Sequence, residues 1–155
     1  MSFRCSDMAG SSQIDSTVEP RPILVVAGIL VKNDRILVCQ RRHDDPYGLQ
    51  WEFPGGKLEP NENPQQALRR ELSEELSIDA EIGDQVFRLR HRYPDRFVEV
   101  AFFLVPAYRG IIRNRVFEAV VWALRSELDR FPFLDADREL VKRICEGEVV
   151  GAASR

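Results

Sequence analysis

The stretch 55–78, GGKLEPNENPQQALRRELSEELSI, limits most strongly what this chain can fold into. A glycine pair leads through a polar loop to the signals of a helix start. Asn63 suits the N-cap, Pro64 the first helical position, and Gln66 completes a capping box. Apolar residues then follow at helical spacing, at Ala67, Leu68, Leu72 and Leu76. The sequence therefore predicts a helix that buries one face and follows a glycine-rich turn.

The opposite face of this predicted helix carries three acidic residues. Glu71, Glu74 and Glu75 are spaced i, i+3 and i+4, which places their side chains within about one helical turn. Like charges this close repel each other and weaken an isolated helix, so the group is either a solvated face or a site for a cation. If it is a cation site, hard oxygen ligands suit Mg²⁺, with Mn²⁺ as the alternative.

The complete spacing favours the cation site. From Gly56, five residues lead to Glu62 and seven more lead to the run Arg70-Glu71-Leu72-x-Glu74-Glu75-x-x-Ile78. This pattern resembles the signature of the Nudix hydrolases and departs from it at one specified position, where Ser77 replaces a glycine. With each fixed residue at a frequency of roughly 6–7%, chance agreement falls below about 10⁻⁶ per starting point. The resemblance implies an α/β fold, the Nudix-type α/β/α sandwich with a central mixed β-sheet.

The rest of the chain fits one globular domain. Its 155 residues suffice to bury a core, and 44% hydrophobic with 30% charged residues is an ordinary composition. The net charge of −3 gives no electrostatic reason to expect a nucleic-acid polymer as partner. No apolar run approaches the ~20 residues of a membrane helix, so we expect no membrane partner. Three scattered cysteines, Cys5, Cys39 and Cys145, fit reduced thiols in a cytoplasmic protein.

Apolar and β-branched patterns predict strands on both sides of the helix. We expect a strand covered on both faces over 23–31, a turn at 32–34 and a partner strand over 35–40. Further strands are expected over 80–92, 96–108 and 116–123, a short helix at 126–129 and a terminal helix over 136–146. These elements predict a flexible leader over 1–22, a Nudix hydrolase domain over 23–148 and a tail over 149–155.

Further similarity narrows the family to its MutT-like branch. The segment 49–57, LQWEFPGGK, resembles the entry to the signature in that branch, and the segments 33–41, 119–122 and 133–137 resemble other parts of it. Members of this branch convert a nucleoside triphosphate to the monophosphate and pyrophosphate. The resemblance therefore implies a small-molecule nucleotide as substrate, with water attacking an internal phosphorus, and we expect a monomer or a homodimer.

The resemblance also implies roles for residues in the stretch 55–75. The implied metal ligands are the backbone carbonyl of Gly55 and the carboxylates of Glu71, Glu74 and Glu75. Arg70 is either a positioning residue for a catalytic carboxylate or an ordinary i, i+4 partner of Glu74. Lys57 either touches a phosphate or is solvated. Glu62 is expected to brace the loop.

Two departures from the family pattern affect the general base and the helix end. The MutT-like branch often has a Glu six residues before the tryptophan that matches Trp122, and this chain has Val116 there. Glu118 lies two positions further along the chain. In a strand, this spacing keeps a side chain on the same face but moves it by about 7 Å along the strand. We assign the base to Glu71 and keep Glu118 as an additional candidate. A serine in the left-handed conformation that the glycine would adopt costs about 1 kcal/mol or slightly more.

Four residues are candidates for binding the base or sugar: Arg41, Arg42, Phe53 and Asp137. Phe53 either stacks on the base or belongs to the core. Asp137 either contacts the base or is a helix N-terminal residue favoured by the dipole. A carboxylate accepts from an exocyclic amine, as on cytosine or adenine, or from a ring N–H. Both CTP or a modified dCTP and 8-oxo-dGTP therefore remain candidate substrates, and the C-terminal pattern favours the first.

The competing class of function is a non-catalytic Nudix-fold module that binds a nucleotide or a protein. Val116 and Ser77 favour this class, whereas the intact glutamate pattern favours an enzyme, because binding alone gives no reason to keep a metal helix. An enzyme acting on the capped ends of RNA is a third option, and it would be expected to have a more basic surface.

Overall fold

The computed structural model describes residues 20–149, so most of the predicted leader and most of the predicted tail lie outside the described residues. The strands are β1 (Ile23–Lys32), β2 (Arg35–Gln40), β3 (Trp51–Glu52), β4 (Gly55–Lys57), β5 (Asp79–Glu81), β6 (Gln85–Tyr93), β7 (Arg96–Val105), β8 (Ala107–Arg109) and β9 (Ala119–Leu124). The helices are α2 (Pro64–Leu76), the 3₁₀ helices η2 (Arg125–Arg130) and η3 (Asp135–Asp137), and α3 (Arg138–Cys145). No helix in the described range is long and apolar enough to cross a membrane. The domain limits at 23 and 148 stay predictions.

β1 and β2 form the predicted hairpin around Asn33 and Asp34. These two residues have φ values of 52° and 67°, and Lys32 pairs with Arg35 across the turn. Positive φ at both central residues is typical of the type I′ turn, whose twist matches that of the strands it joins. Asn and Asp adopt this conformation more readily than most residues, so the local sequence sets the register of the hairpin.

β1 lies at the centre of the sheet. It pairs in parallel with β7, from Ile23 opposite Val98 to Leu30 opposite Val105, and antiparallel with β2 and β4. Within the described residues the mixed sheet has seven strands, with β9 beside β2 and β6 beside β7. Because β4 pairs with β1, the glycine pair lies directly against the central strand.

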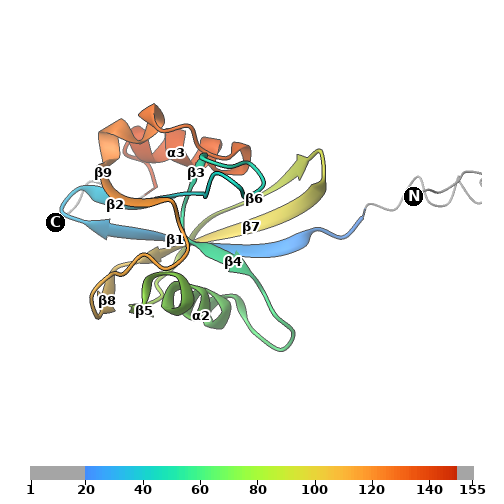
Figure 1. Ribbon diagram of the computed structural model, residues 1–155, viewed down its shortest axis with the longest axis horizontal. Helices are drawn as coiled ribbons and strands as arrows, with labels where there is room; N and C mark the ends of the chain where they lie inside the picture. Colours follow the sequence, from blue (N-terminus) through green and yellow to red (C-terminus); the bar gives the residue numbers. More distant parts are fainter. Residues whose placement is uncertain (1–19, 150–155) are drawn as a thin grey trace, which may run out of the picture.

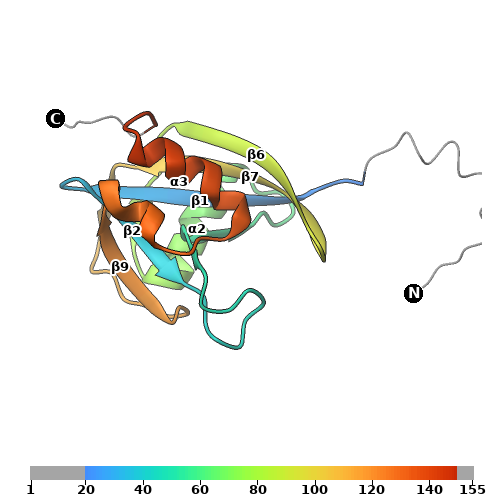
Figure 2. The same ribbon diagram turned by 90° about the horizontal axis from the view of Figure 1, so that it is seen from above.

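Two helical layers cover the sheet, α2 on one face and α3 with η2 on the other (Figure 1, Figure 2). Alternate residues of β1 face these layers. Val26 and Leu30 belong to the core cluster that contains the buried face of α2, whereas Ala27 and Ile29 belong to the cluster that contains α3. The predicted strand with two covered faces and the predicted α/β/α sandwich are confirmed.

Two predicted strands are each divided in the structure. The segment 80–92 forms β5 and β6, because its two parts pair with different strands, β5 with β8 and β6 with β7. The segment 96–108 is interrupted at Pro106, which has no backbone N–H to donate to a ladder. The divided strands form a small two-stranded sheet of β5 and β8 beside the end of α2.

Two further elements begin later than predicted. The strand expected from 116 begins at Ala119, because the Asn114 side chain accepts the backbone N–H groups of Val116 and Phe117 and holds them in a turn. The terminal helix begins at Arg138, after the 3₁₀ turn η3. The short helix expected at 126–129 is present as η2, which is a 3₁₀ helix.

Candidate active site

Helix α2 begins with the predicted capping box. The Asn63 side chain accepts the Gln66 backbone N–H at 2.8 Å, and the Gln66 side chain accepts the Asn63 N–H at 2.9 Å. The buried residues of the helix are Ala67, Leu68, Leu72 and Leu76. Their burial fixes the rotation of the helix about its axis and leaves Glu71 and Glu75 beside β4.

The carboxyl groups of Glu71 and Glu75 contact each other next to the glycine pair. A side-chain hydrogen bond joins Glu75 to Glu71, and the Glu75 carboxyl also accepts the backbone N–H of Gly55 at 3.2 Å. Burial, followed by the charges of Glu71 and Glu52, raises the pKa of Glu75 well above its usual range. Burial also raises the pKa of Glu71. Two carboxyl groups are therefore held together in a region where negative charge is concentrated.

Arg70 connects the loop before α2 to the acidic face of the helix. Its guanidinium donates to Glu62 at 2.6 and 3.0 Å, to Glu71 at 3.1 Å and to Glu74 at 3.4 Å. It also donates to the backbone oxygen of Lys57 at 3.1 Å. The hydrogen bond from Arg70 lowers the pKa of the Glu62 carboxyl to about 2. These contacts go beyond an ordinary i, i+4 pair with Glu74 and support both a positioning role for Arg70 and a bracing role for Glu62.

The glycine pair is required by close packing, since neither glycine has a positive φ. A Cβ on Gly56 would lie 2.7 Å from Glu71 Oε1 and would also overlap the rest of that carboxylate. A Cβ on Gly55 would lie 2.7 Å from Ala27 Cα and would overlap the backbone of Val26. Gly56 therefore lets the Glu71 carboxylate lie against the backbone, and Gly55 lets β4 lie against β1.

Ser77 ends α2 in the left-handed conformation that the family signature fills with glycine. Its φ and ψ are 63° and 35°, and its backbone N–H donates to Ser73 O. Its hydroxyl accepts a hydrogen bond of 3.0 Å from Arg115 Nη1. The expected backbone strain at this serine is thus present, and it is accompanied by a side-chain contact that glycine could not make.

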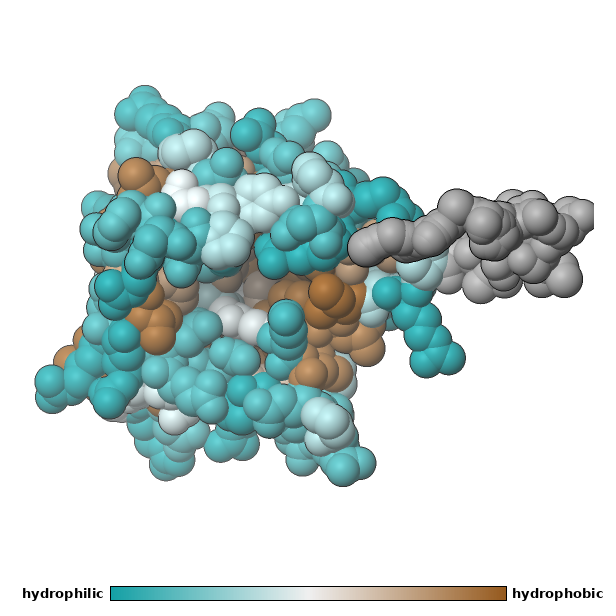
Figure 3. Space-filling model, turned by 45° about the vertical axis from the view of Figure 1, so that its right-hand side comes forward, coloured by the Kyte–Doolittle hydropathy of each residue, from teal (hydrophilic) through white to brown (hydrophobic). Residues whose placement is uncertain are grey.

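A cavity of about 290 Å³ lies between β1, β7, the glycine pair and the start of α3. The predicted site residues that line it are Arg41, Phe53, Gly55, Lys57, Glu75 and Asp137. Its apolar side includes Val25 of β1 and Val100 of β7. Figure 3 shows apolar surface in the middle of one face of the molecule, between hydrophilic surface above and below. The cavity therefore connects Glu75 of α2 with Asp137 on the opposite layer.

Asp137 and Phe53 are joined by a hydrogen bond, but their side chains differ in character. The Asp137 carboxyl accepts the Phe53 backbone N–H, and burial followed by the charge of Glu52 raises the pKa of Asp137 well above its usual range. Asp137 makes no side-chain capping bond to α3. The Phe53 ring is only 3% exposed and packs on Phe102 and Phe133. Of the two alternatives for Phe53, the structure favours the core.

Arg42 and Glu118 do not line this cavity, in contrast to the prediction for Arg42. Arg41 lines the cavity, whereas the next residue, Arg42, is exposed. Arg42 Nε donates to Val116 O at 2.8 Å. A Glu118 carboxylate oxygen lies 3.7 Å from His43 Nδ1, and both side chains are largely exposed.

Sequence reasoning missed two polar residues of the cavity, Glu52 and Arg96. Glu52 accepts a hydrogen bond of 3.1 Å from Arg41, and burial raises its pKa. The Arg96 guanidinium lies 5.6 and 5.4 Å from the ring centroids of Tyr47 and Tyr93, and its buried Nε has no hydrogen-bond partner among the described residues. A charged residue between Trp51 and Phe53 was the available signal for Glu52, whereas nothing local marks Arg96.

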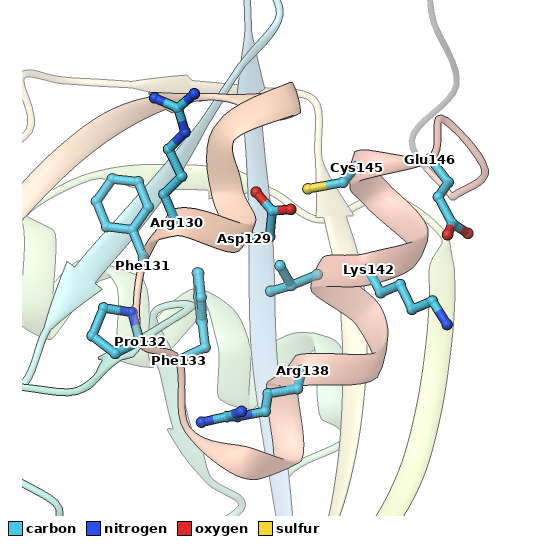
Figure 4. Close-up of a pocket in the computed structure, with 10 residues that line it drawn as sticks. Asp129, Arg130, Phe131, Pro132, Phe133, Arg138, Lys142, Cys145 and Glu146 are labelled. Atoms are coloured by element: carbon cyan, nitrogen blue, oxygen red, sulfur yellow. The ribbon is translucent and has the colours of Figure 1, made fainter.

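A second and larger hollow, of about 670 Å³, lies on the α3 layer. Figure 4 shows Arg130, Phe131 and Phe133 on one side of it and Lys142 and Cys145 of α3 on the other. None of the predicted site residues lines it. The smaller cavity is therefore lined by six of the predicted site residues, whereas Arg70, Glu71 and Glu74 do not line it.

Comparison with known proteins identifies the family. The model of the NUDIX domain matches residues 22–144. The chain belongs to the Nudix family. It is 38% identical over 121 residues to the CTP pyrophosphohydrolase of Escherichia coli, a match that covers 77% of this chain and 89% of the relative. It is 39% identical over 99 residues to the 8-oxo-dGTP diphosphatase of Proteus vulgaris, a match that covers 63% of this chain and 88% of the relative.

A solved structure of the family agrees with the fold. The crystal structure of a MutT Nudix hydrolase from Burkholderia pseudomallei has a TM-score of 0.72 and 26% identity, covering 79% of this chain and 98% of that one. The predicted MutT-like branch of the Nudix family and the assignment as a hydrolase are therefore confirmed.

Nudix hydrolases generally use divalent metal cations, and the acidic residues present here fit such an ion. Glu71 and Glu75 are two acids held against each other, an arrangement in which a bound cation would offset the repulsion between the two carboxylates. Glu74 lies apart from this pair, with a side chain 59% exposed and bonded to Arg70. Within residues 20–149, no three His, Cys, Asp or Glu side chains are close enough to form a metal-binding group.

Proposed function

We propose that this Nudix hydrolase converts a nucleoside triphosphate to the monophosphate and pyrophosphate by attack of water on an internal phosphorus. CTP or a modified dCTP is the preferred substrate, and 8-oxo-dGTP is the alternative. One observation carries the proposal. A single cavity connects the Glu75 end of the acidic helix face with a second group of polar side chains, namely the buried Asp137 and the partly buried Arg41 and Glu52. This arrangement suits a ligand with a polyanion at one end and a hydrogen-bonding base at the other.

At the phosphate end, Glu71, Glu75 and the backbone carbonyl of Gly55 would hold Mg²⁺ or Mn²⁺, with Glu74 as a further ligand. When bound, the ion neutralises phosphate oxygens and lowers the pKa of the attacking water. Glu71 accepts the proton of this water on its carboxylate, and Arg70 keeps that carboxylate in place through its 3.1 Å contact. The exposed Lys57 at the cavity edge provides positive charge for a phosphate oxygen.

At the base end, Asp137 and Glu52 provide the recognition groups. The raised pKa of Asp137 favours a neutral carboxyl, which both donates and accepts a hydrogen bond. Cytosine offers an amine that donates and a ring nitrogen that accepts, so it matches such a carboxyl. The volume of about 290 Å³ lies at the low end for small-molecule sites, which suits a compact group such as a single base.

The same proposal sets the partners and the location. The substrate is a small nucleotide of the cytoplasmic pool, and the enzyme works as a monomer or a homodimer without a nucleic-acid polymer. A non-catalytic binding module is disfavoured because the relatives described above are named as hydrolases and the Glu71–Glu75 pair is kept.

The proposal is tested by incubating the protein with Mg²⁺ and each of CTP, dCTP, 5-methyl-dCTP, dGTP and 8-oxo-dGTP. Pyrophosphate and orthophosphate are measured separately, and the reaction is repeated in ¹⁸O water. We expect pyrophosphate as the first product and the highest kcat/KM for a cytosine nucleotide. Orthophosphate as the first product, carrying all of the ¹⁸O label, would contradict the proposed reaction. Nucleotide binding without any product would instead favour the binding module.

A further inference from the structure

The loop between β8 and β9 holds the C-terminal end of α2. The backbone N–H of Arg115 donates to Glu75 O at 3.0 Å, and that of Arg113 donates to Leu76 O at 2.9 Å. The Arg115 guanidinium donates to Ser77 Oγ at 3.0 Å. Three consecutive residues at the end of the acidic helix are thus bonded to one loop.

The end of α2 needs these donors. The last carbonyl groups of a helix have no partner within the helix, and they carry the negative end of its dipole. α2 has no basic residue in its last turn, which instead contains Glu74 and Glu75. Two unfavourable features therefore meet there, and the loop supplies both N–H donors and the positive charge of Arg115.

The loop is itself held in place from its other side. The Asn114 side chain accepts the N–H groups of Val116 and Phe117 at 3.2 and 2.8 Å and donates to Phe117 O at 2.9 Å. Arg42 Nε donates to Val116 O at 2.8 Å. The loop is therefore a fixed connection between the end of β2 and the end of α2, and Arg115 is presented from a rigid turn.

The two departures from the family signature meet at this contact. Ser77 stands where the signature has glycine, and Val116, directly after Arg115, stands where the MutT-like branch often has glutamate. Glycine has no side chain to accept a hydrogen bond, whereas the serine hydroxyl accepts one from Arg115. The serine and the loop therefore form one arrangement, in which the contact offsets part of the backbone strain at Ser77.

We propose that Arg115 and Ser77 are positioning residues for Glu75. The inference rests on the proposed function, because it takes Glu75 as a metal ligand. Glu75 is held at two points, its backbone oxygen by Arg115 N–H and its carboxyl by Gly55 N–H. Without the side-chain contact between Arg115 and Ser77, the backbone bond from Arg115 N–H to Glu75 O is held less firmly. The last helical turn can then shift and move the Glu75 carboxyl away from Glu71. Neither Arg115 nor Ser77 lines the cavity, so both act through Glu75 and not on the nucleotide.

The test compares Ser77→Ala, Ser77→Gly, Arg115→Gln and Arg115→Lys. The matched controls are Ser73→Ala and Arg90→Gln. Ser73 is an exposed serine of the same helix, and Arg90 is an exposed arginine of β6 that pairs with Glu99 of β7. We expect Ser77→Ala and Arg115→Gln each to lower kcat and to raise the Mg²⁺ concentration for half-maximal rate by about 3- to 10-fold. KM for the nucleotide should change less than about 2-fold. Arg115→Lys should recover part of the loss, and the double variant Ser77→Ala/Arg115→Gln should lose no more than either single one.

Ser77→Gly separates positioning from stability. Glycine relieves the left-handed strain, so the Tm should equal or exceed that of the wild type while the metal requirement rises as in Ser77→Ala. If both Ser77 variants keep the wild-type kcat and Mg²⁺ midpoint, the contact is only structural and the inference is wrong.

A readout without turnover keeps this inference distinct from the proposed function. Mn²⁺ affinity of the free protein, measured by electron paramagnetic resonance, should fall about 3- to 10-fold in Ser77→Ala and Arg115→Gln but not in the two controls. A protein that hydrolyses no nucleotide but shows this pattern refutes the proposed reaction and supports the positioning role. Unchanged Mn²⁺ affinity in both variants overturns the positioning role whatever the substrate.

Discussion

The two glycines of the signature stretch should fail in different ways when each is changed to alanine. In Gly56→Ala the new methyl group meets the end of a side chain, since the Cβ would lie 2.7 Å from Glu71 Oε1. Ordinary contacts need roughly 3.5 Å, so the carboxylate must move by about 1 Å. In Gly55→Ala the methyl group meets the backbone of β1, at 2.7 Å from Ala27 Cα, where no side-chain rotation can relieve the overlap.

These geometries give two separate magnitudes. A misplacement of about 1 Å at a catalytic group can cost on the order of 10²-fold in rate, so Gly56→Ala should lose about this much in kcat/KM and keep its Tm within a few degrees. Gly55→Ala should lose about 3 kcal/mol or more of stability because β4 is pushed away from β1, which lowers the Tm by roughly 10 °C.

The assay is a pyrophosphate release measurement at saturating Mg²⁺ together with thermal unfolding of both variants and the wild type. The informative comparison is the ratio of activity lost to stability lost. Wild-type turnover in Gly56→Ala would show that the position of the Glu71 carboxylate does not matter for the reaction. A loss of stability in Gly56→Ala as large as in Gly55→Ala would refute the distinction between side-chain and backbone contact.

Two further predictions concern the residues around Arg70. Glu74→Gln should keep the fold, because the side chain is 59% exposed, and should lower kcat by at least about 10²-fold if Glu74 joins the metal ligands; near wild-type turnover at saturating Mg²⁺ would remove it from the ligand set. Glu62 has its pKa lowered from 4.5 to about 2, so its ion pair with Arg70 stabilises the fold above about pH 4.5 and is lost as the pH falls toward 2. Glu62→Gln should therefore lower the Tm at pH 7, and the difference from the wild type should shrink between pH 4.5 and 2, whereas a constant difference would speak against the ion pair.

The parts of the site that were predictable from sequence are those set by local rules. The capping box of Asn63 and Gln66, the buried stripe of α2 and the left-handed residue at Ser77 all depend on neighbours within one or two helical turns. The turn at Asn33 is local in the same sense. Each of these features was present in the structure as expected, because the residues that determine it are adjacent in the chain.

The base end of the cavity could not be predicted in the same way. Glu52, Arg96 and Asp137 come from β3, β7 and the start of α3, and only the packing of these elements brings them to one cavity. The choice of Arg41 over Arg42 depended on how the loop that follows β2 lies against the cavity. The apolar pattern of residues 80–92 did not show that this segment forms two strands, β5 and β6. The pairing partner changes from β8 to β7 within it, and Gly83 is the local signal at that point.

Asp137 offers the sharpest test of base recognition, provided that the variant keeps its structural contact. The carboxyl accepts the Phe53 backbone N–H, so Asp137→Ala leaves a buried donor without a partner and costs about 1–3 kcal/mol of stability by itself. Asp137→Asn retains an acceptor for that N–H and replaces the other oxygen with an NH₂ donor. The matched control is Asp135→Asn, whose exposed carboxylate lies in the same 3₁₀ turn and pairs with Arg138.

If Asp137 reads the base as a neutral carboxyl, the asparagine variant keeps one donor and one acceptor and should keep its selectivity, whereas Asp137→Ala should change selectivity strongly. Alanine leaves the donor and the acceptor of the cytosine edge without partners, and a mismatch of 1–3 kcal/mol corresponds to about 5- to 150-fold in relative kcat/KM. We therefore expect the ratio of kcat/KM for dCTP to that for 8-oxo-dGTP to fall by at least about 5-fold in Asp137→Ala, with Asp137→Asn and Asp135→Asn close to the wild type. If Asp137 instead only stabilises the start of α3, the alanine variant should lower kcat/KM for CTP, dCTP, 5-methyl-dCTP, dGTP and 8-oxo-dGTP in parallel. Parallel losses would remove Asp137 from the recognition site, and the preference for a pyrimidine would go with it.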